Sequence, residues 1–264
     1  MADATRPTDL PARLPDVLAE SGVRPGGVLM VHSSLSGTGL TPTAVRDALL
    51  DALGPEGTLV VPAFTPENSD TSREYHTFTE GMTEREKGEF RAAMPPFEKD
   101  ATPCLTMGAL AECVRTTPGA VRSAHPQTSF AGLGPRAAEL LAGHDPHCHL
   151  GERSPLATLY AADARILLLR VGFEVCTAFH LAEYRTIPKP PTRTYRCVLE
   201  EKGNWIEYED LALFDGDFGE IGAQVPRELL REREWAGRPV FLLGIRDAVD
   251  TAQRLMSGYR GGLT

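Results

Sequence analysis

Short apolar runs alternate along the chain with segments whose apolar residues recur at helical spacing. Four runs are typical of buried strands: residues 26–34 (GGVLMVHSS), 57–64 (GTLVVPAF), 164–172 (ARILLLRVG) and 237–244 (GRPVFLLG). Segments with one apolar helical face indicate helices at residues 10–18, 42–53, 107–117, 135–143, 154–162 and 245–256. This alternation predicts an α/β fold in which a sheet is sandwiched between helices.

Local signals mark the ends of several of these helices. Thr41 is a candidate N-cap, and Pro42 suits a first turn because the N–H that proline lacks would have no partner there. Gly54 and Pro55 are expected to end the same helix, and Pro118 to end the helix of residues 107–117.

Two segments break the alternation. Residues 65–103 are polar and charged, and a connection of this length is unusual in a compact domain, so we expect a long loop on the substrate side. Residues 194–210 (TYRCVLEEKGNWIEYED) alternate apolar and polar positions around a turn signal at residues 202–204. They predict a small antiparallel hairpin.

Composition is that of an ordinary globular protein. The chain has 264 residues, of which 42% are hydrophobic and 24% charged, and this predicts a single domain over residues 1–264. No apolar run approaches the roughly 20 residues of a membrane helix, and the polar start MADATRPTDLPARLP is unlike a signal peptide. The five cysteines show no CxxC pair, as is typical of reduced thiols. We therefore expect a cytoplasmic protein with no membrane partner.

The net charge of −9 disfavours nucleic acid and anionic membranes as partners, because phosphate binding needs a basic face. An acidic protein attracts a cationic ligand, although acidity also serves solubility. Composition thus favours a cationic small molecule and leaves a monomer and a homodimer both open.

The sequence CTAFHLAEY follows directly after the predicted strand of residues 164–172. If it begins a helix, His180 and Glu183, three residues apart, project from one helical face at the carboxyl end of a strand, where open α/β sheets place their sites. Imidazole accepts protons near neutral pH, and a neighbouring carboxylate can orient it or bind an ammonium group. The alternative is a hydrogen-bonded core histidine beside a solvated glutamate.

Hydroxyl groups gather after the first predicted strand, at Ser33, Ser34 and Ser36, ahead of two glycines. Hydroxyls and backbone amides there could hold a phosphate or a pantetheine-like amide chain. The alternative is a plain transition from strand to loop. The segment lacks both the G-x-S-x-G elbow and the lysine of a P-loop.

A second polar stretch, GAVRSAHPQTSFAGLG, brings together Arg122, His125 and Ser129. Loops that mix such residues often line anion sites, while the alternative is a turn-rich connection directed by Pro126.

The segment GHDPHCHLGE raises a metal hypothesis through His144, His147, Cys148 and His149. Zinc sites usually need a further pair of ligands elsewhere, and none is evident, so a polar loop without metal is expected.

Acidic residues gather in two other places. The segment DLALFDGDFGEIG carries Asp215, Asp217 and Glu220 among aromatic residues, and the long polar segment carries Glu67, Asp70 and Glu74. Carboxylates interleaved with aromatic rings could bind a polycation, or form solvated acidic loops.

Five blocks in this order resemble the aminoglycoside 3-N-acetyltransferase family over nearly the whole chain: LMVHSSLSGTG, GTLVVPAFTPENSD, TMGALAECVRTTPGAVRSAHPQTSFAGLGPRA, SPLATLYAADARILLLRVGFEVCTAFHLAEYR and DFGEIG. The resemblance implies an αβα sandwich that uses acetyl-CoA to acetylate the 3-amino group of 2-deoxystreptamine antibiotics.

The resemblance also implies roles for individual residues. His180 would be the general base, with Glu183 beside it in the acidic substrate pocket. Coenzyme A would be contacted by Ser33, Ser34 and Leu35, with Arg122, His125 and Ser129 along its pantetheine or phosphate path. The substrate's ammonium groups would be held by Asp217 and Glu220. Apart from the resemblance, the carboxylates of Glu67, Asp70 and Glu74 could add negative charge around the same ligand.

Three positions depart from the family pattern. Cys104 and Leu105 stand where a threonine and a cation are usual, which would affect coenzyme A binding. Arg170 replaces an expected glycine near the strand end that presents His180. Alternatives that remain open are the same transfer to another amine metabolite, a non-catalytic protein that sequesters aminoglycosides, and a metal hydrolase.

Overall fold

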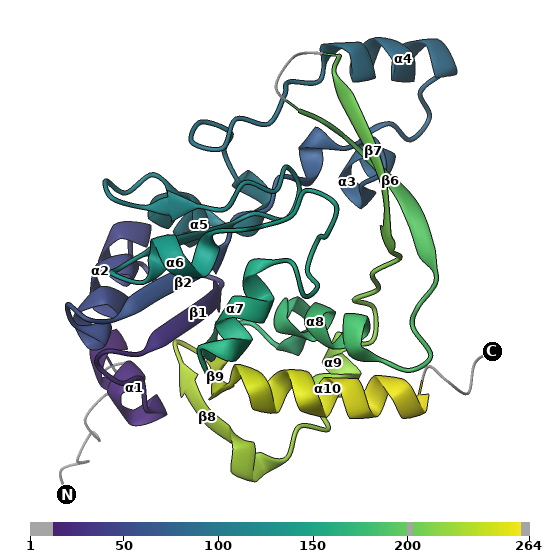
Figure 1. Cartoon of the computed structure of the whole chain (residues 1–264). Coiled ribbons are helices and arrows are strands. Elements are labelled where there is room, and N and C mark those ends of the chain that lie inside the picture. Colours follow the sequence, from purple (N-terminus) through teal and green to yellow (C-terminus); the bar gives the residue numbers. More distant parts are fainter. Residues whose placement is uncertain (1–12, 200–202, 260–264) are drawn as a thin grey trace, which may run out of the picture.

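A computed structural model describes residues 13–199 and 203–259. Within these residues seven strands form one sheet in the order β3-β4-β2-β1-β5-β9-β8 (Figure 1). The strands are β1 (Val28–Ser33), β2 (Thr58–Pro62), β3 (Val121–Arg122), β4 (Phe130–Leu133), β5 (Arg165–Leu169), β8 (Leu230–Trp235) and β9 (Arg238–Gly244). The central strand β1 pairs in parallel with β2 and β5, and the other neighbours pair antiparallel.

Helices cover both faces of this sheet. One layer comprises α1 (Leu14–Ser21), α2 (Pro42–Leu53) and α5 (Ala109–Arg115), and the other α6 (Ala137–Leu141), α7 (Pro155–Ala161), α8 (Ala178–Arg185), α9 (Phe218–Gly222) and α10 (Ile245–Tyr259). Successive side chains of a strand point to opposite faces of the sheet. Leu29 therefore packs with α1 and α2, and Met30 packs with α7 and α8. The αβα sandwich is confirmed.

The predicted helix ends are also confirmed at α2. The Thr41 side chain accepts a hydrogen bond from the Ala44 amide, Pro42 lies in the first turn, and Gly54 ends the helix with φ +64°. A positive φ favours glycine because it has no Cβ to clash. Both ends of α2 can therefore be predicted from the sequence.

A separate two-stranded hairpin, β6 (Thr192–Val198) and β7 (Trp205–Leu211), stands beside the sandwich and confirms the second irregular segment as antiparallel. Of its predicted turn, residue 202 lies outside the described residues. Figure 1 shows the hairpin running from the region of α9 and α10 up to α3 (Arg73–Phe78) and α4 (Glu84–Ala93). Tyr75 and Met94 pack against Val198, so the polar segment and the hairpin support each other.

Three expectations needed correction. The segment of residues 65–103 is not simply a loop, because it contains the short 3-10 helix η1 (Pro66–Asn68) together with α3 and α4, and α4 begins with a capping box between Thr83 and Glu86. Residues 121–122 and 130–133 form the short strands β3 and β4, which the sequence did not indicate, on either side of a connection at residues 123–129 that contains a turn. The edge strand β8 was not expected, because it is mostly charged and exposed, as edge strands often are.

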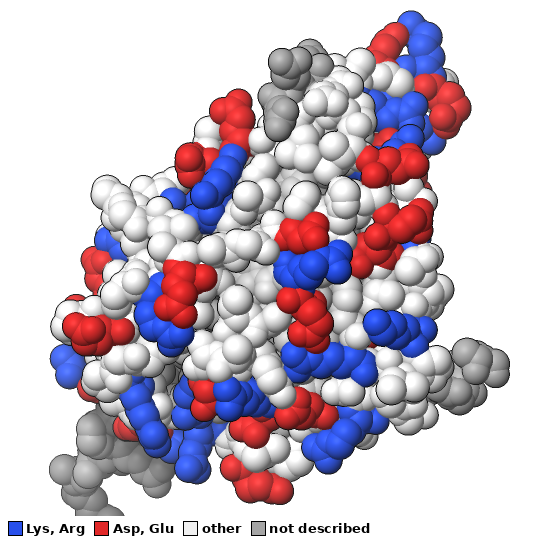
Figure 2. Space-filling model, viewed as in Figure 1, with Lys and Arg blue, Asp and Glu red and all other residues white. Residues whose placement is uncertain are grey.

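Acidic and basic side chains are interspersed over the face drawn in Figure 2. That face therefore offers no broad field of a single sign. No helix in the described ranges is long and apolar enough to cross a membrane.

Candidate functional site

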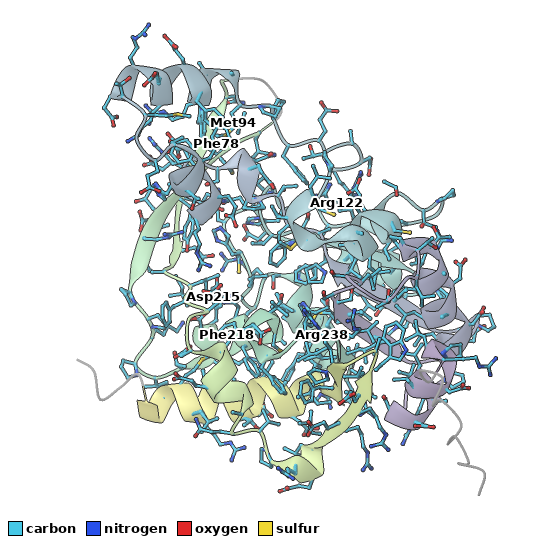
Figure 3. All side chains as sticks on the ribbon, turned by 180° about the vertical axis from the view of Figure 1, so that it is seen from behind. Phe78, Met94, Arg122, Asp215, Phe218 and Arg238 are labelled. Carbon is cyan, nitrogen blue, oxygen red and sulfur yellow. The ribbon has the colours of Figure 1, made fainter. Side chains whose placement is uncertain are left out.

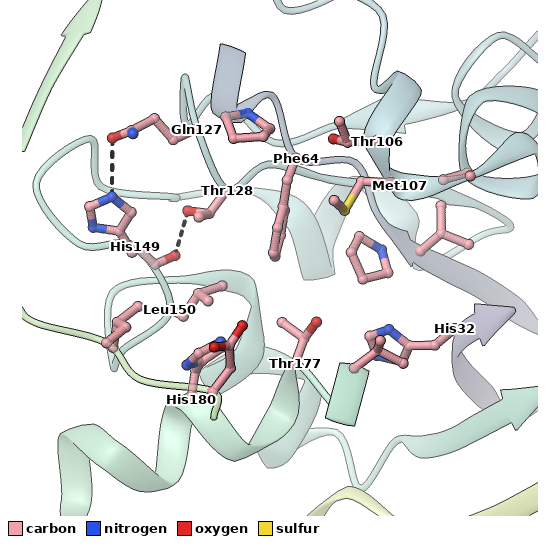
Figure 4. A pocket seen from close by; sticks show the side chains of 18 of the residues that line it. His32, Phe64, Thr106, Met107, Gln127, Thr128, His149, Leu150, Thr177 and His180 are labelled. Atoms are coloured by element: carbon pink, nitrogen blue, oxygen red, sulfur yellow. Dashed lines mark hydrogen bonds between the residues drawn. The ribbon is translucent and has the colours of Figure 1, made fainter. Parts of the chain in front are cut away.

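A cleft of about 500 Å³ opens at the carboxyl ends of the parallel strands β1, β2 and β5 (Figure 4). Its walls come from the strand ends, from the segment before α5, from α3, from the start of α8 and from the hairpin. The polar and charged side chains that line it include His32, Ser33, Arg73, Glu74, Gln127, His149, Glu174, Thr177, His180, Arg193, Tyr195 and Asp215. Ligand sites of open α/β sheets occur at this edge.

His180 and Glu183 form a hydrogen-bonded pair in this cleft. His180 Nδ1 lies 2.6 Å from Glu183 Oε2, and the imidazole is 15% exposed while the carboxylate is fully buried. The other carboxylate oxygen accepts a hydrogen bond of 3.0 Å from the Phe214 amide, and the Phe218 ring lies 4.7 Å from the imidazole. With Nδ1–H donating to the carboxylate, the ring presents a lone pair on Nε2.

The helix α8 orients this pair because most of its side chains are buried. Phe179, Leu181 and Ala182 are fully buried in the layer that packs on α10. Residues three apart share a helical face, so His180 and Glu183 project together. Figure 3 shows Asp215 and Phe218 close together above α10, on the segment that covers His180.

A second histidine–carboxylate pair involves His149 and Asp210. His149 Nδ1 lies 3.0 Å from Asp210 Oδ2, which also accepts hydrogen bonds from the His149 amide and the Tyr184 hydroxyl. His149 Nε2 lies 3.1 Å from the side-chain oxygen of Gln127 and 3.0 Å from the Tyr208 hydroxyl. Both ring nitrogens are therefore engaged by the protein.

The charges of this second pair follow from burial and hydrogen bonding. Burial lowers the pKa of His149 in spite of the neighbouring carboxylate. Burial alone would raise the pKa of Asp210, but hydrogen bonds from His149 and Tyr184 bring it below its usual value. The pair is a neutral imidazole beside an ionised carboxylate at pH 7.

The other two buried histidines of this region lie behind the cleft wall. His125 Nδ1 accepts hydrogen bonds from the amides of Gln127 and Thr128, and His144 Nδ1 lies 3.0 Å from the Ser123 hydroxyl. Burial lowers the pKa of His125 well below its usual value and that of His144 to about 4. In the described part of the chain, no three His, Cys, Asp or Glu side chains are grouped to hold a metal ion.

Among the residues expected at coenzyme A, Ser33 lines the cleft. Ser34 follows β1, and its amide donates a hydrogen bond to the Leu169 carbonyl. Neither Ser34 nor Leu35 lines the cleft. Arg170 adopts φ +63°, the conformation that a glycine would take without strain, and its guanidinium bonds the carbonyls of Ser34 and Ser36. Its charge is thus directed to the backbone of the loop after β1 rather than into the cleft.

Arg122 and Ser129 are buried below the cleft. The Arg122 guanidinium donates to Ser129 Oγ and to the carbonyls of Ala63, Lys99 and Thr102. Burial lowers its pKa to about 10. These contacts join β3 and the end of β2 to the segment before α5, and the guanidinium does not line the cleft.

The acidic residues divide into those that line the cleft and those that do not. Glu74 and Asp215 line it, as does Glu174, which sequence reasoning missed. Asp70 is buried and paired with Arg196 on β6, with Arg91 3.7 Å away. Glu67, Asp217 and Glu220 are outside the cleft lining; burial raises the pKa of Glu67, Asp217 is buried, and Glu220 is exposed.

Two arginines in the cleft were also missed. Arg73, on α3, forms an ion pair of 2.8 Å with Asp215, and Arg193, on β6, lies over the Tyr195 ring. The alternation of the hairpin could have indicated that Arg193 and Tyr195, two apart on one strand, share a face. No local signal joins Arg73 to Asp215, which are 142 residues apart.

The remaining departures lie near the start of α5. Burial raises the pKa of the Cys104 thiol to about 12, and its sulfur donates to Glu112. Leu105, at the start of η2 (Leu105–Met107), is 71% exposed. Cys104 is therefore an inert buried thiol, and Leu105 offers an apolar surface where a cation was expected.

Fold and site together define an α/β protein with a hydrogen-bonded histidine–glutamate pair at the carboxyl edge of its central parallel strands. Residues 30–257 match the family model described as aminoglycoside 3-N-acetyltransferase, so the chain belongs to this family of acyltransferases.

Individual relatives support the assignment. The SPbeta prophage-derived aminoglycoside N(3')-acetyltransferase-like protein YokD of Bacillus subtilis (strain 168) is 34% identical over 240 residues, which are 88% of this chain and 87% of that protein. The crystal structure of YokD superposes with a TM-score of 0.84, at 31% identity, over 93% of this chain and 97% of that one.

Two other solved structures contain ligands. The binary complex of AAC-IIIb with CoASH has a TM-score of 0.78 and 26% identity, over 93% of this chain and 95% of that one. AAC-VIa bound to sisomicin has a TM-score of 0.75 and 26% identity, over 93% of this chain and 96% of that one.

Proposed function

We propose that this chain transfers the acetyl group of acetyl-CoA to the 3-amino group of 2-deoxystreptamine aminoglycosides and thereby gives resistance to them. The chain acts as one domain, because the hairpin and the sheet contribute to the same cleft. The observation that carries the proposal is the 2.6 Å pair of His180 and Glu183 in that cleft.

His180 is the general base in this proposal. An aminoglycoside amine arrives protonated, so it must lose a proton before or during attack on the thioester carbon. His180 Nε2 accepts that proton, and the buried Glu183 carboxylate fixes the ring and stabilises the imidazolium that forms. The new N–C bond forms as the C–S bond breaks. The ammonium loses two protons in becoming an amide, of which one reaches the leaving thiolate through His180 and the other passes to solvent.

Direct transfer needs no nucleophile from the protein. Cys176 is fully buried, and burial raises its pKa to about 12, so its thiol is a poor nucleophile near neutral pH. This supports a single acyl transfer from sulfur to nitrogen, without a covalent intermediate on the protein.

The cleft provides features that suit the acyl donor. Ser33 and the apolar side chains of Val31, Leu110 and Ala111 line it, and a CoASH complex is known for the relative AAC-IIIb. An amide chain fits such a mixed wall. Five residues expected at coenzyme A do not line the cleft and would support its wall from the surrounding loops and strands: Ser34, Leu35, Arg122, His125 and Ser129.

Substrate ammonium groups would be bound chiefly by the carboxylates that line the cleft. Glu74 and Asp215 come from different elements and lie in the same cavity as His180. Glu67, Asp70, Asp217 and Glu220 would then act through the local negative potential, since they do not line the cleft.

The test is release of coenzyme A thiol from acetyl-CoA with a panel of 2-deoxystreptamine aminoglycosides, and the site of acetylation read by mass spectrometry and NMR. We expect release with at least one compound and acetylation at its 3-amino group. Tight aminoglycoside binding without thiol release from any compound would instead support a sequestering protein. Acetylation at another amine would contradict the regiochemistry.

A second candidate is the same transfer to a less cationic amine. The cleft contains Arg73 and Arg193 beside its carboxylates, and Arg73 already neutralises Asp215. Two guanidinium groups oppose the entry of a polycation, whereas a monoamine avoids most of that repulsion. Including amino sugars and simple monoamines in the panel separates the two candidates by their kcat/KM values.

A further inference from the structure

One imidazole in the cleft has neither a role in the proposed reaction nor a hydrogen-bond partner for its Nε2 among the described residues. His32 lies near the end of the central strand β1, opposite Leu168 of β5, and lines the cleft beside Ser33 (Figure 4). Its side chain is anchored on the most enclosed strand of the sheet, and the residue is only 8% exposed. The ring is therefore held in place by packing.

The His32 ring lacks hydrogen-bond partners within the described residues. Nε2 is buried without a partner, and no described group bonds Nδ1. Leaving a buried polar group unpaired costs about 1–3 kcal/mol, so such groups are rare unless a ligand or water completes them. By contrast, Glu183 bonds His180, and Asp210 bonds His149.

Burial also determines the charge of the ring. The pKa of His32 is lowered to about 4, so the imidazole is neutral at pH 7. A neutral imidazole has one N–H donor and one acceptor nitrogen. The N–H of the neutral ring can donate to an uncharged carbonyl oxygen. An ammonium group is instead bound more strongly by a carboxylate.

We propose that His32 donates a hydrogen bond to a carbonyl oxygen of the acyl donor, either the thioester oxygen or an amide oxygen of the pantetheine arm. This inference rests on the proposed function. The apolar residues Val31, Val61 and Ala111 line the cleft with it, and a hydrogen bond in such surroundings is little weakened by water. At the thioester, the bond would strengthen as negative charge develops on oxygen during attack.

The experiment compares His32→Leu, which removes both nitrogens, with His32→Gln, whose amide can donate from nearly the same place. The control is His144→Gln, because His144 is also buried and neutral but does not line the cleft. Folding is checked by melting temperature. The Kd of acetyl-CoA is measured by calorimetry without an amine, and kcat by thiol release.

We expect His32→Leu to lower kcat by about 10- to 100-fold, or to raise the Kd of acetyl-CoA by about 10-fold, with much of the loss restored in His32→Gln. A change in kcat assigns the bond to the thioester oxygen, and a change in Kd assigns it to the pantetheine arm. His144→Gln should lower the melting temperature but leave kcat and the Kd of acetyl-CoA within about 2-fold of the wild-type values. A tenfold change in either corresponds to about 1.4 kcal/mol.

Unchanged kcat and Kd in His32→Leu would overturn the inference, as would equal losses in His32→Leu and His32→Gln. A wild-type protein that releases no thiol with any amine contradicts the proposed function instead. In that case the acetyl-CoA affinities of the same variants still decide whether His32 contacts the donor.

Discussion

The two histidine–carboxylate pairs of the cleft use the same chemical groups with different surroundings. In both, Nδ1 of the ring lies within 3.0 Å of a carboxylate oxygen: 2.6 Å for His180 and Glu183, and 3.0 Å for His149 and Asp210. The difference is at the other nitrogen. Gln127 and Tyr208 hold Nε2 of His149, whereas no described residue bonds Nε2 of His180.

The proposed assignment of one catalytic pair and one structural pair rests on this difference. An imidazole whose nitrogens are both engaged cannot accept a substrate proton without breaking a hydrogen bond, so His149 is suited to holding the hairpin against the sheet. His180, oriented at one nitrogen and open at the other, has the arrangement of a general base. The pairing of imidazole with carboxylate is therefore insufficient by itself to identify a catalytic group.

The largest effect is expected from His180→Ala. It should lower kcat by about 100-fold or more, because the amine loses its proton acceptor, while aminoglycoside binding persists. Thiol-release kinetics and calorimetry check the two parts. Glu183→Gln removes the charge that stabilises the imidazolium and leaves one acceptor oxygen for two donors, the His180 ring and the Phe214 amide, so it should lower kcat by about 10-fold or more. Near-normal turnover in His180→Ala would remove His180 from its role.

Sequence predicted that His180 and Glu183 lie side by side, but not the pairing of His149 with Asp210. His180 and Glu183 are three residues apart on one helix, so helical geometry alone brings them together. His149 and Asp210 are 61 residues apart, and Asp70 and Arg196 are 126 apart. Such pairs depend on how the hairpin docks on the sheet, which no local pattern encodes.

The same contrast holds for the fold. The strands β1, β2, β5 and β9 were predicted because buried strands have nearly continuous apolar runs. The strand β8 has a charged, exposed sequence that resembles a loop, and β4 has four residues including a glycine. Elements whose burial is one-sided or brief leave too weak a pattern to predict.

A second prediction concerns acid stability. Burial lowers the pKa values of His32 and His144 from 6.5 to about 4. Between these values the unfolded chain takes up protons that the folded protein does not, so the free energy of unfolding falls as the pH falls from 6.5 to 4. The loss is about 3 kcal/mol for each histidine at pH 4.

Urea unfolding at several pH values measures this loss. Because His144 contributes part of it, His144→Gln should show a shallower dependence on pH than the wild type. A free energy of unfolding that stays constant from pH 6.5 to 4 would contradict the neutral state of the buried His32 and His144 in the folded protein.

The smallest effect tests the structural pair directly. In Asp210→Asn the carboxylate that accepts from His149 and Tyr184 loses its charge, and one of its bonds becomes donor against donor. The free energy of unfolding should fall by about 1–3 kcal/mol, measured by urea titration at pH 7. Turnover per folded molecule should change by less than about 3-fold, since His180 and Glu183 keep their contacts. A loss of turnover as large as that of Glu183→Gln, without a loss of stability, would show that His149 and not only His180 takes part in proton transfer.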